Sequence, residues 1–537
     1  MVDHDILIVG AGPSGLMLAL ECQRFGVDFG LIEKRPGPSE HSKALGIWSG
    51  TLEALSPLAL TGTFLDRGVQ INAARFADRG NTLARFDASE GVDSLYPHPI
   101  ILPQNETEAI LIEKLESSGG RVERELECID LAQENDQVRA TLKTATGETI
   151  TRTCRYLVGC DGSRSPVRNL CGIEFPGSTE PATYLLYDGT IDGHDLPNEL
   201  MSCWSGEGAL VVIPIKNGQY RLICQRERGE DLSAPTREEL QEQVDHNGPA
   251  NWQLGEPDWA SAFRISERIA DDFRDRRVFL CGDAAHIHSP AGGQGMNTGM
   301  QDASNLAWKL AAALGQPGDP EKWLNSYQEE RRPVAESVVK GAQEKLQFGM
   351  AQGLLARVIK DLAVSTVFQS AAFRKHLAFD LSELGIEYEE SAMIEPDAWG
   401  YSTGGYKPGV RVRSAPVQDA NGDTTELWER LLHPGFTLLF FGAKPNPESH
   451  DLWNQIRAKV DAANAEDLQF WSVWQSKTLP DGVDSSNALL DPEGKAHHRF
   501  GIHGPGWYLI RPDLYVGSRS SPVCFETLQS VLDLYFT

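Results

Sequence analysis

The feature that most constrains this chain is a short apolar segment that ends in a glycine-rich turn. Residues 5–9 read Asp-Ile-Leu-Ile-Val, a run typical of a buried parallel strand, and Gly10-Ala11-Gly12-Pro13-Ser14-Gly15 follows at once. A helical pattern then runs from Leu16 to about Phe25. Gly10 permits the tight turn, Gly12 lets a pyrophosphate approach the backbone, and Gly15 lets the helix pack on the strand. The pattern predicts a dinucleotide-binding unit.

A second predicted strand, at residues 28–32, completes this unit. It ends at Glu33, eighteen positions beyond Gly15, where a carboxylate can accept hydrogen bonds from ribose hydroxyls. Ser14 and Lys34 are further candidate contacts. This fingerprint alone fits either FAD or NAD, so the rest of the chain has to decide between them.

Two other segments carry comparable patterns. A predicted strand at 277–281 runs into Gly282-Asp283-Ala284-Ala285-His286 and a glycine-rich loop from Pro290 to Asn297. A helix follows, with an apolar stripe at Leu306, Leu310 and Leu314 that Gly315 closes. The other segment is Tyr156 to Arg168, which contains an Asp-Gly pair at Asp161.

These segments resemble, nearly residue for residue, the FAD-binding stretches of the single-component flavin-dependent aromatic hydroxylases, which include phenol hydroxylase-like and polyketide-tailoring monooxygenases. The resemblance covers residues 5 to about 335, including Tyr327, Glu330, Arg331 and Pro333 of a Ser-Tyr-x-x-Glu-Arg-Arg-Pro segment. It implies that Asp283, beside Gly282, holds the ribityl chain of FAD. It also implies a loop around the isoalloxazine, formed by Pro290, Gly293, Gly295, Met296 and Asn297.

The same resemblance implies other cofactor contacts. Asp161 and Arg164 lie in a motif that serves FAD and the transient nicotinamide, Gln104 occupies the position of an FAD-contacting residue, and Lys43 stands near the FAD phosphates. Because only one dinucleotide fingerprint occurs, NADPH or NADH is expected to visit transiently and reduce the flavin. Disulfide reductases, which carry two fingerprints and a redox cysteine pair, are disfavoured.

The expected fold is α/β, with a Rossmann-type FAD-binding domain formed by residues 1–175 and 275–345. Residues 176–274 are expected to form an inserted β-rich substrate domain, with a hairpin of 209–215 and 219–224 whose second strand alternates between pocket and solvent. Residues 346–400 are expected to be a helical segment and linker. Residues 401–537 resemble the thioredoxin-like domain of phenol hydroxylase-type relatives, with strands at 436–441 and 508–512.

That C-terminal region contains only Cys524, so thiol exchange is not expected there, and a structural or subunit-contact role, as in a homodimer, is favoured. The nine cysteines of the chain form no C-x-x-C pair, and no His/Cys cluster has metal-binding spacing. A net charge of -27 disfavours nucleic acid and anionic membranes as partners. The N-terminus lacks the pattern of a signal peptide, which predicts a cytoplasmic protein.

In the resembled family, reduced flavin captures dioxygen as a 4a-hydroperoxide that transfers one oxygen atom to an aromatic ring. We therefore expect an NAD(P)H-dependent FAD monooxygenase that hydroxylates a phenolic or polycyclic aromatic substrate with dioxygen. The same chemistry could serve epoxidation, Baeyer-Villiger insertion or oxidative dehalogenation, and a sequestering flavoprotein is a non-enzymatic alternative. The segment from Trp204 to Pro214 does not match the flavin halogenase signature.

The residue that activates the substrate is not identified. Phenol hydroxylases have an Asp where this chain has Leu45, and Gly50 replaces an Arg that is common in relatives. Pocket candidates are His288, Pro290, Tyr220 and Arg221, whereas His286 is expected to serve packing and hydrogen bonding. Tyr187 and Trp204 could also line a pocket, although such strand residues are more often part of a core.

Overall fold

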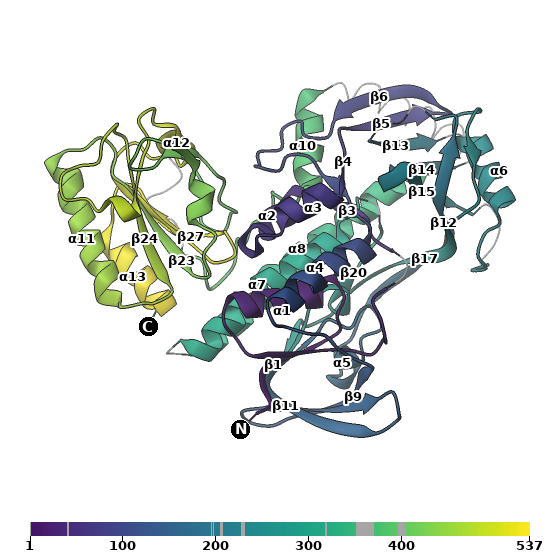
Figure 1. The fold of residues 1–537 in the computed structure, drawn as a ribbon, viewed down its shortest axis with the longest axis horizontal. Coiled ribbons are helices and arrows are strands. Elements are labelled where there is room, and N and C mark those ends of the chain that lie inside the picture. Colours follow the sequence, from purple (N-terminus) through teal and green to yellow (C-terminus); the bar gives the residue numbers. More distant parts are fainter. Residues whose placement is uncertain are drawn as a thin grey trace. The chain divides into compact units, whose positions relative to one another are not determined.

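The computed structural model describes residues 2–39, 42–194, 196, 198–204, 208–226, 231–290, 292–316, 319–350, 370–395 and 404–536. The chain divides into two compact units (Figure 1). Unit 1 comprises Met1–Ala303 and Arg332–Leu384, and unit 2 comprises Ser304–Arg331 and Gly385–Thr537. The predicted linker falls partly on residues 396–403, which lie outside the described part of the chain.

A parallel sheet forms the base of unit 1. Its parallel strands are β1 (His4–Val9), β2 (Phe29–Glu33), β11 (Thr149–Gly159) and β19 (Val278–Leu280). The strands predicted at 5–9, 28–32 and 277–281 are thereby confirmed. Val9 is in register with Ile32 and with Gly159. Because parallel strands end at the same edge of a sheet, the segments that follow β1, β11 and β19 gather at one place.

Four further strands extend this sheet. They are β8 (Glu123–Arg124), β9 (Leu126–Gln133), β10 (Val138–Thr144) and β18 (Arg274–Asp275). The helices of the same region are α1 (Pro13–Arg24), α4 (Gln104–Ser117) and α5 (Pro166–Leu170), and α1 packs against α4 (Figure 1). Eight consecutive residues of α1, from Gly15 to Cys22, are buried, which fits a helix covered on several sides.

Two long helices follow the second glycine-rich loop. They are α7 (Gly295–Gly315) and α8 (Pro320–Met350). Helix α7 begins earlier than the sequence suggested, because Thr298 N–H donates to Gln294 O (2.8 Å) and closes a first turn that includes Asn297. The last residues of the predicted loop are therefore helical.

A nine-stranded sheet forms the other large layer of unit 1. Its strands are β5 (Ala73–Asp78), β6 (Asn81–Asp87), β12 (Gly177–Asp192), β13 (Glu199–Trp204), β14 (Ala209–Pro214), β15 (Gln219–Gln225), β16 (Gln253–Leu254), β17 (Trp259–Ile269) and β20 (His286–Ile287). The predicted hairpin is present as the antiparallel pair β14–β15. Strands β5, β6 and β20 come from outside residues 176–274, so the sheet draws on three parts of the chain.

The two faces of this sheet differ. Tyr187, Val212 and Leu222 lie on a face whose apolar core also includes Leu240 and Val244 of α6 (Arg237–Asn247). Arg221 lies on the other face and is also buried. The alternation predicted for β15 is present, but its second face is not open to solvent at Arg221.

Smaller elements complete unit 1. They are β3 (Gly46–Ile47), β4 (Val69–Gln70), β7 (Ile100–Ile101), α2 (Ser49–Ala54), α3 (Thr61–Arg67) and α10 (Ala371–Leu381). Phe373 and Leu377 of α10 pack against Phe76 and Phe86 of β5 and β6. The predicted helical stretch after residue 345 is present to Met350 and again in α10, and residues 351–369 lie outside the described part of the chain.

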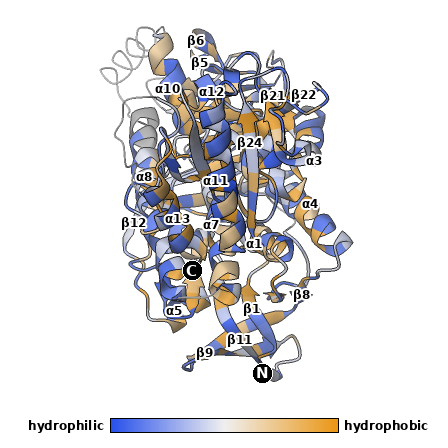
Figure 2. Ribbon diagram, turned by 90° about the vertical axis from the view of Figure 1, so that its left-hand side faces the viewer, coloured by the Kyte–Doolittle hydropathy of each residue, from blue (hydrophilic) through white to orange (hydrophobic). Residues whose placement is uncertain are grey.

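Unit 2 contains a mixed seven-stranded sheet. Its strands are β21 (Pro416–Gln418), β22 (Thr424–Glu426), β23 (Phe436–Phe441), β24 (Leu468–Trp474), β25 (Ala488–Leu490), β26 (Gly506–Ile510) and β27 (Val516–Ser520), with helices α11 (Pro447–Ala463), α12 (Lys495–Arg499) and α13 (Phe525–Phe536). Strand β23 has the predicted bounds, is fully buried, and pairs parallel with β24 and antiparallel with β26. Figure 2 shows apolar residues along β24 and a mixture of polar and apolar residues along α11.

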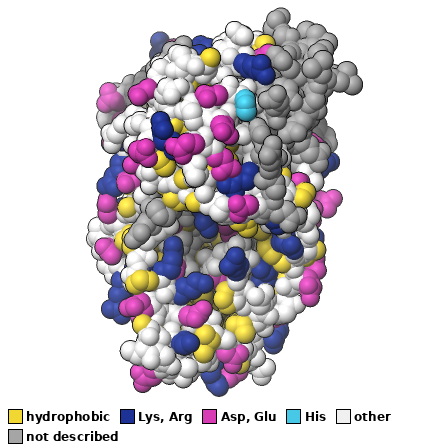
Figure 3. All heavy atoms as spheres, turned by 90° about the vertical axis from the view of Figure 1, so that its right-hand side faces the viewer, with side chains coloured by type: hydrophobic (Ala, Val, Ile, Leu, Met, Phe, Trp, Pro, Cys, Tyr) yellow, Lys and Arg dark blue, Asp and Glu magenta, His cyan; other side chains and the backbone are white. Residues whose placement is uncertain are grey.

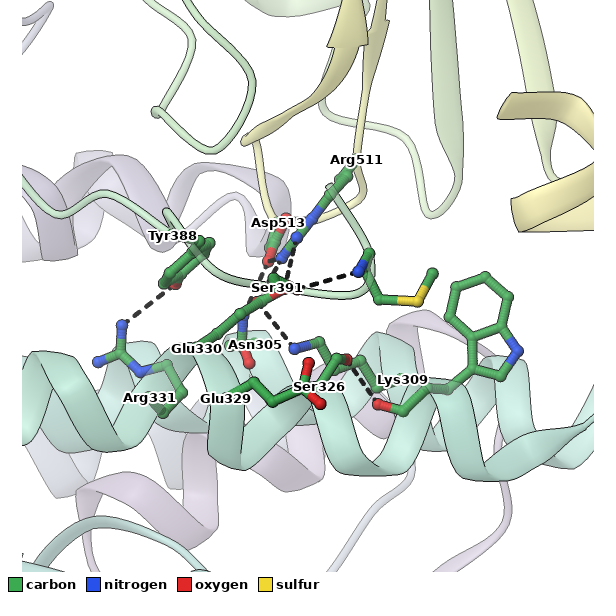
Figure 4. Close-up of polar contacts among 12 residues, drawn as sticks. Asn305, Lys309, Ser326, Glu329, Glu330, Arg331, Tyr388, Ser391, Arg511 and Asp513 are labelled. Atoms are coloured by element: carbon green, nitrogen blue, oxygen red, sulfur yellow. Dashed lines mark hydrogen bonds and ion pairs between the residues drawn. The ribbon is translucent and has the colours of Figure 1, made fainter. Parts of the chain in front are cut away.

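A fully buried ionic cluster lies within unit 2 (Figure 4). Glu330 of α8 pairs with Lys309 of α7 (2.8 Å) and with Arg511, which follows β26 (2.8 Å). Arg511 also pairs with Asp513 (2.6 Å). Two positive and two negative groups therefore compensate each other in a dry environment.

None of the described helices is both long enough and apolar enough to cross a membrane. Within the described ranges, no group of three or more His, Cys, Asp or Glu side chains is arranged to hold a metal ion. On the face shown in Figure 3, acidic and basic side chains are interspersed rather than gathered by sign.

Candidate active site

The first glycine turn has the geometry that phosphate binding requires. Gly10 has a φ of 105°, and a Cβ there would lie 2.4 Å from the carbonyl oxygen of Cys160. A Cβ on Gly15 would lie 1.9 Å from the Gly10 oxygen, so strand and helix meet too closely for any side chain. A Cβ on Gly12 would meet nothing within 4 Å. Open space therefore borders the N-terminus of α1 at the residue expected to face a pyrophosphate.

Ser14 connects this turn with the second glycine-rich segment. Its hydroxyl lies beside Gly282 and Gly299, where added Cβ atoms would come within 2.4 and 2.6 Å of the Ser14 oxygen. The segments after β1 and β19 are therefore in direct contact, as their shared sheet edge implies.

Glu33 closes the same region at the end of β2. Its carboxylate accepts hydrogen bonds from Ala11 N–H (3.0 Å), Arg35 N–H (3.0 Å) and Arg35 Nε–H (3.1 Å). Burial acts to raise the pKa of Glu33, but these hydrogen bonds hold it below its usual value. An ionised carboxylate beside the glycine turn suits the recognition of ribose hydroxyls. The neighbouring Lys34 is exposed.

Asp161 lies at the end of β11, on the other side of β1. Its Oδ2 accepts from Val167 N–H at the start of α5 (3.0 Å). Its Oδ1 is buried and has no hydrogen-bond partner among the described residues, and burial raises the pKa of this carboxyl group. A buried acceptor without a partner is expected to meet a donor from a ligand or from water. Arg164 nearby is exposed.

Arg168 was not singled out as a site residue by its sequence, yet it joins two of the motifs. It donates to Ala284 O (2.8 Å) and to Ser163 O (2.9 Å). The turn that carries Asp283 is thereby tied to the segment that carries Asp161. Its position within the Asp-Gly motif was the only sequence signal for this contact.

Asp283 follows Gly282 in the turn after β19. Its side chain is accessible to solvent, yet dense protein surroundings raise its pKa by desolvation, and His286 and Lys43 act in the opposite direction. Lys43, which is exposed, therefore lies near enough to Asp283 for their charges to interact. His286 is buried against Asp302 (2.7 Å), which agrees with the packing role expected for it.

Asn297 fixes the loop expected to wrap the flavin ring. Its side chain accepts from Trp48 N–H (2.9 Å) and donates to Gly46 O (2.8 Å) and Gly293 O (2.9 Å). Trp48 also donates through Nε1 to Gly292 O (3.0 Å). No local pattern pointed to Trp48, because its partners are more than 240 positions away.

The other loop residues are more open. Pro290 and Gly293 are exposed and Met296 is half-buried. The ring of His288 lies against Gly295, where an added Cβ would be 3.3 Å from Nε2, and its Nδ1 lies 2.7 Å from Ser289 O. Of the four pocket candidates, His288 and Pro290 therefore lie at the flavin loop.

The remaining two pocket candidates lie elsewhere in the sheet. Tyr220 belongs to the packed core, and its hydroxyl lies 3.2 Å from Leu196 O. Arg221 forms a buried pair with Asp188 (2.7 Å) and donates to Ser42 O (2.7 Å) and Lys43 O (3.4 Å). Arg221 thus holds the backbone of the segment that carries Lys43.

Gln104, the first residue of α4, also contacts the segment of residues 42–43. Its N–H lies 2.7 Å from Ser42 Oγ, and its side chain donates to Glu108 (2.9 Å). Leu45, two positions beyond Lys43, is buried in an apolar cluster with Ile71 and Ile101. Tyr187 lies in the packed core, with its hydroxyl 2.7 Å from Thr190 O.

The comparison with known families decides the identity of this arrangement. The family described as "FAD binding domain" matches residues 3–342, which include every segment of the site described above. The chain belongs to the FAD-dependent aromatic hydroxylases. It is a monooxygenase with FAD as its cofactor and NADPH or NADH as its reductant, and the alternative of a sequestering protein is set aside.

The relatives match along nearly the whole chain. The uncharacterized aromatic compound monooxygenase YhjG of Bacillus subtilis is 33% identical over 100% of this chain and 99% of its own length. The 6-methylpretetramide 4-monooxygenase of Streptomyces rimosus is 31% identical over 98% of this chain and 93% of its own. The structure of an aklavinone-11 hydroxylase with FAD and aklavinone is 25% identical, with a TM-score of 0.79 over 100% and 99% of the two chains.

Proposed function

We propose that this hydroxylase acts on a phenolic substrate with fused aromatic rings. The observation that carries this proposal is an apolar cluster around the buried Leu45, against which the partly buried Leu200, Ile213 and Ile215 pack. Ile213 is paired in the sheet with Arg221, which binds the backbone of residues 42–43. Apolar surroundings of this kind beside the segment that carries Lys43 suit a large flat ring system and keep water away from it.

The relatives support a substrate of this size. The names of two full-length matches refer to 6-methylpretetramide and to aklavinone, and those proteins cover nearly all of this chain. Pentachlorophenol 4-monooxygenase of Sphingobium chlorophenolicum, whose printed substrate has one ring, is 29% identical over 96% of this chain. The apolar cluster around Leu45, rather than the ranking of relatives, favours the fused-ring class.

We further propose the cofactor contacts. The turn at Gly10, Gly12, Ser14 and Gly15 holds the pyrophosphate, and Glu33 with Lys34 borders the ribose. Asp283, beside Gly282, holds the ribityl chain, and Lys43, Gln104 and Asp161 complete the surroundings of the dinucleotide. The open space at Gly12 and the partnerless Oδ1 of Asp161 support this placement. The isoalloxazine contacts are Pro290, Gly293, Gly295, Met296 and Asn297.

When bound, FAD takes a hydride from the nicotinamide and activates dioxygen, so that one oxygen atom enters the aromatic ring. The protein contributes position and electrostatics. The first turn of α7 presents its free N–H groups and the positive end of its dipole to the loop, which stabilises negative charge there. Leu45 provides no carboxylate for deprotonating a phenol, and His288 is the titratable pocket candidate at the loop.

Four other expectations remain proposals. Unit 2 is proposed to be thioredoxin-like, because β23, α11 and β24 form a parallel βαβ unit that precedes the antiparallel pair β26–β27 and helix α13. A structural or dimer-forming role is favoured for it, since Cys524 is its only cysteine. The division into FAD, substrate and C-terminal domains and a cytoplasmic location also stay predictions.

The test is turnover with matched substrates. Purified holoenzyme would be supplied with NADPH or NADH, ¹⁸O₂ and either tetracyclic, anthracyclic or single-ring phenols. We expect one ¹⁸O atom in a hydroxylated fused-ring product and tighter binding of the fused-ring compounds. Preference for a single ring would overturn the substrate class. A ring-expanded lactone, an epoxide or released halide would point to one of the alternative oxygenations.

A further inference from the structure

The segment at the end of α10, residues 380–383, crosses the flavin loop and the start of α2. Gly50 N–H donates to Ser382 O (2.8 Å), and Gln294 Nε2 donates to Asp380 O (3.3 Å). Leu381 lies against Gly292, where an added Cβ would be 3.4 Å from its Cδ2. We call residues 380–383 the crossing segment. It lies more than 80 positions beyond the loop that it contacts.

Gly50 is fitted to this crossing segment. A Cβ on Gly50 would lie 3.0 Å from Glu383 O and 3.1 Å from Ser382 O. Both neighbours are backbone atoms, which cannot move aside as the end of a flexible side chain can. The glycine that stands where relatives commonly carry an arginine therefore gives the crossing segment room to pass.

Glu383 places a buried carboxylate at this crossing. It is 2% exposed and has a φ of 57°, a backbone conformation that is uncommon for a residue with a side chain. Its carboxylate lies 3.1 Å from Thr298 Oγ1 and accepts from Gln301 Nε2 (2.5 Å). On α7, Thr298 directly follows the predicted flavin contacts Met296 and Asn297, and Gln301 lies one helical turn after Asn297.

We propose that Glu383 is a positioning residue for the flavin loop. Its two carboxylate oxygens hold Thr298 and Gln301, and through them the first turns of α7. Burying a carboxylate is costly unless hydrogen bonds compensate it, so a carboxylate kept here in a strained backbone points to a specific task. This inference rests on the proposed contacts between the loop and FAD.

The other end of α10 gives this link a second contact. Phe373 and Leu377 pack on β5 and β6, which belong to the nine-stranded sheet proposed to border the substrate. Helix α10 and the crossing segment therefore join that sheet to the flavin loop within unit 1. A loosened crossing segment is expected to lower the fraction of reducing equivalents that reach product.

The pairing can be tested by exchanging its partners. In Glu383→Gln, one of the two carboxylate oxygens becomes an amide N–H₂ and the charge is lost, so a single neutral acceptor oxygen is left for Gln301 Nε2 and Thr298 Oγ1. In Gln301→Glu, two carboxylates face each other. The double variant Glu383→Gln with Gln301→Glu restores one donor and one acceptor in reversed order. Glu125→Gln is a matched control, because Glu125 also has a positive φ (61°) but is exposed.

Each variant would be stripped of FAD and titrated with FAD by flavin fluorescence, and the visible spectrum of the reconstituted protein would be recorded. We expect about tenfold weaker FAD binding and an altered flavin spectrum in each single variant, and recovery to within about threefold in the double variant. Product formed per NAD(P)H consumed should fall in each single variant and recover in the double variant. Glu125→Gln should match the parent protein in all three measurements.

Unchanged FAD affinity and spectrum in Glu383→Gln would overturn the proposal. Equal losses in the single and double variants would overturn it as well, since the loss would then not depend on the pair. Failure of the parent protein to take up FAD would instead overturn the proposed cofactor contacts. The double variant keeps the proposal testable even if a single variant folds poorly.

Discussion

The surroundings of Glu330 in unit 2 and those of Asp161 and Asp283 in unit 1 shift the pKa of these acids in opposite directions. In unit 2, burial acts to raise the pKa of Glu330, but Arg511 and Lys309 hold it well below its ordinary value. In unit 1, burial raises the pKa of Asp283 and of Asp161, and their neighbours compensate only partly. A structural cluster supplies its own counter-charges, whereas a binding site leaves acceptors for a ligand.

The same comparison explains one motif of the sequence. Glu330 belongs to the Ser-Tyr-x-x-Glu-Arg-Arg-Pro segment, which the family resemblance includes among the FAD-binding stretches. Its carboxylate is instead surrounded by Arg511, Lys309, Asn305 and Ser391 (Figure 4). This motif therefore serves the packing of unit 2, where α7 and α8 meet the strand that precedes Arg511.

The largest effect is expected from removing one charge of the cluster in unit 2. Arg511→Met leaves Glu330 and Asp513 with only Lys309 as a counter-charge, which should lower the free energy of unfolding of unit 2 by about 3–5 kcal/mol. Urea denaturation followed by tryptophan fluorescence would measure it. Arg457→Met, in a more exposed pair with Asp461 (3.4 Å), should cost less than about 1 kcal/mol. Equal losses would contradict a self-compensated core cluster.

The second prediction concerns pH and the same cluster. The pKa of Glu330 lies below its ordinary value of 4.5, so its stabilising contribution is complete above that pH and declines as the pH falls below it. Glu330→Gln should therefore be clearly less stable than the parent at pH 7, and the difference should shrink toward pH 3. Burial lowers the pKa of Lys309 to about 8, so stability should rise from there toward pH 10. A stability difference between Glu330→Gln and the parent protein that does not change with pH would contradict the lowered pKa of Glu330.

The third prediction concerns an acid that lacks such compensation. Asp283→Asn should weaken FAD binding by about 10- to 100-fold, because a charge-assisted hydrogen bond to the ligand is lost. The protein without FAD should be no less stable than the parent at neutral pH, since the raised pKa means that ionised Asp283 does not favour the fold there. Titration with FAD and thermal unfolding measure the two effects. Asp66→Asn, at an exposed position of α3, is the control.

The smallest effect is expected from a neutral contact at the loop. Trp48→Phe removes the hydrogen bond from Nε1 to Gly292 O and keeps the aromatic packing. A neutral hydrogen bond contributes about 0.5–1.5 kcal/mol, so FAD affinity should fall by about threefold to tenfold. Trp471→Phe in unit 2 removes an indole N–H far along the chain and should leave FAD affinity unchanged. A loss as large as that of Asp283→Asn would show that the loop depends on more than this bond.

The sequence predicted the parallel strands, the first glycine turn and β23 because their signals are local. Continuous apolar runs and glycines at fixed spacing act within about ten residues. The start of α7 was placed too late because Gly295 and Asn297 are poor helix formers, and the turn is closed by contacts to Trp48 and Gly46. Arg168, Trp48 and Glu383 escaped notice because their partners are distant in the sequence.

The candidate pocket residues also depended on contacts that are distant in the sequence. Tyr220 and Arg221 are neighbours in β15, and the alternation of a strand sends their side chains to opposite faces. The pattern alone could not tell which face meets the segment that carries Lys43. The contacts of Arg221 with Ser42 and Lys43 show that it is the Arg221 face, because they join the sheet to the segment that leads to Leu45.

The spacing of the first glycine turn by itself predicted a dinucleotide-binding unit, because glycines at fixed positions let the backbone approach a pyrophosphate. Its assignment to FAD came from the resemblance of the Asp283 segment to the flavin-dependent aromatic hydroxylases, and the family match over residues 3–342 confirms the cofactor. The tertiary structure decided that counter-charges compensate Glu330 fully and Asp283 only partly. That distinction depends on counter-charges brought from distant parts of the chain, and only packing places them.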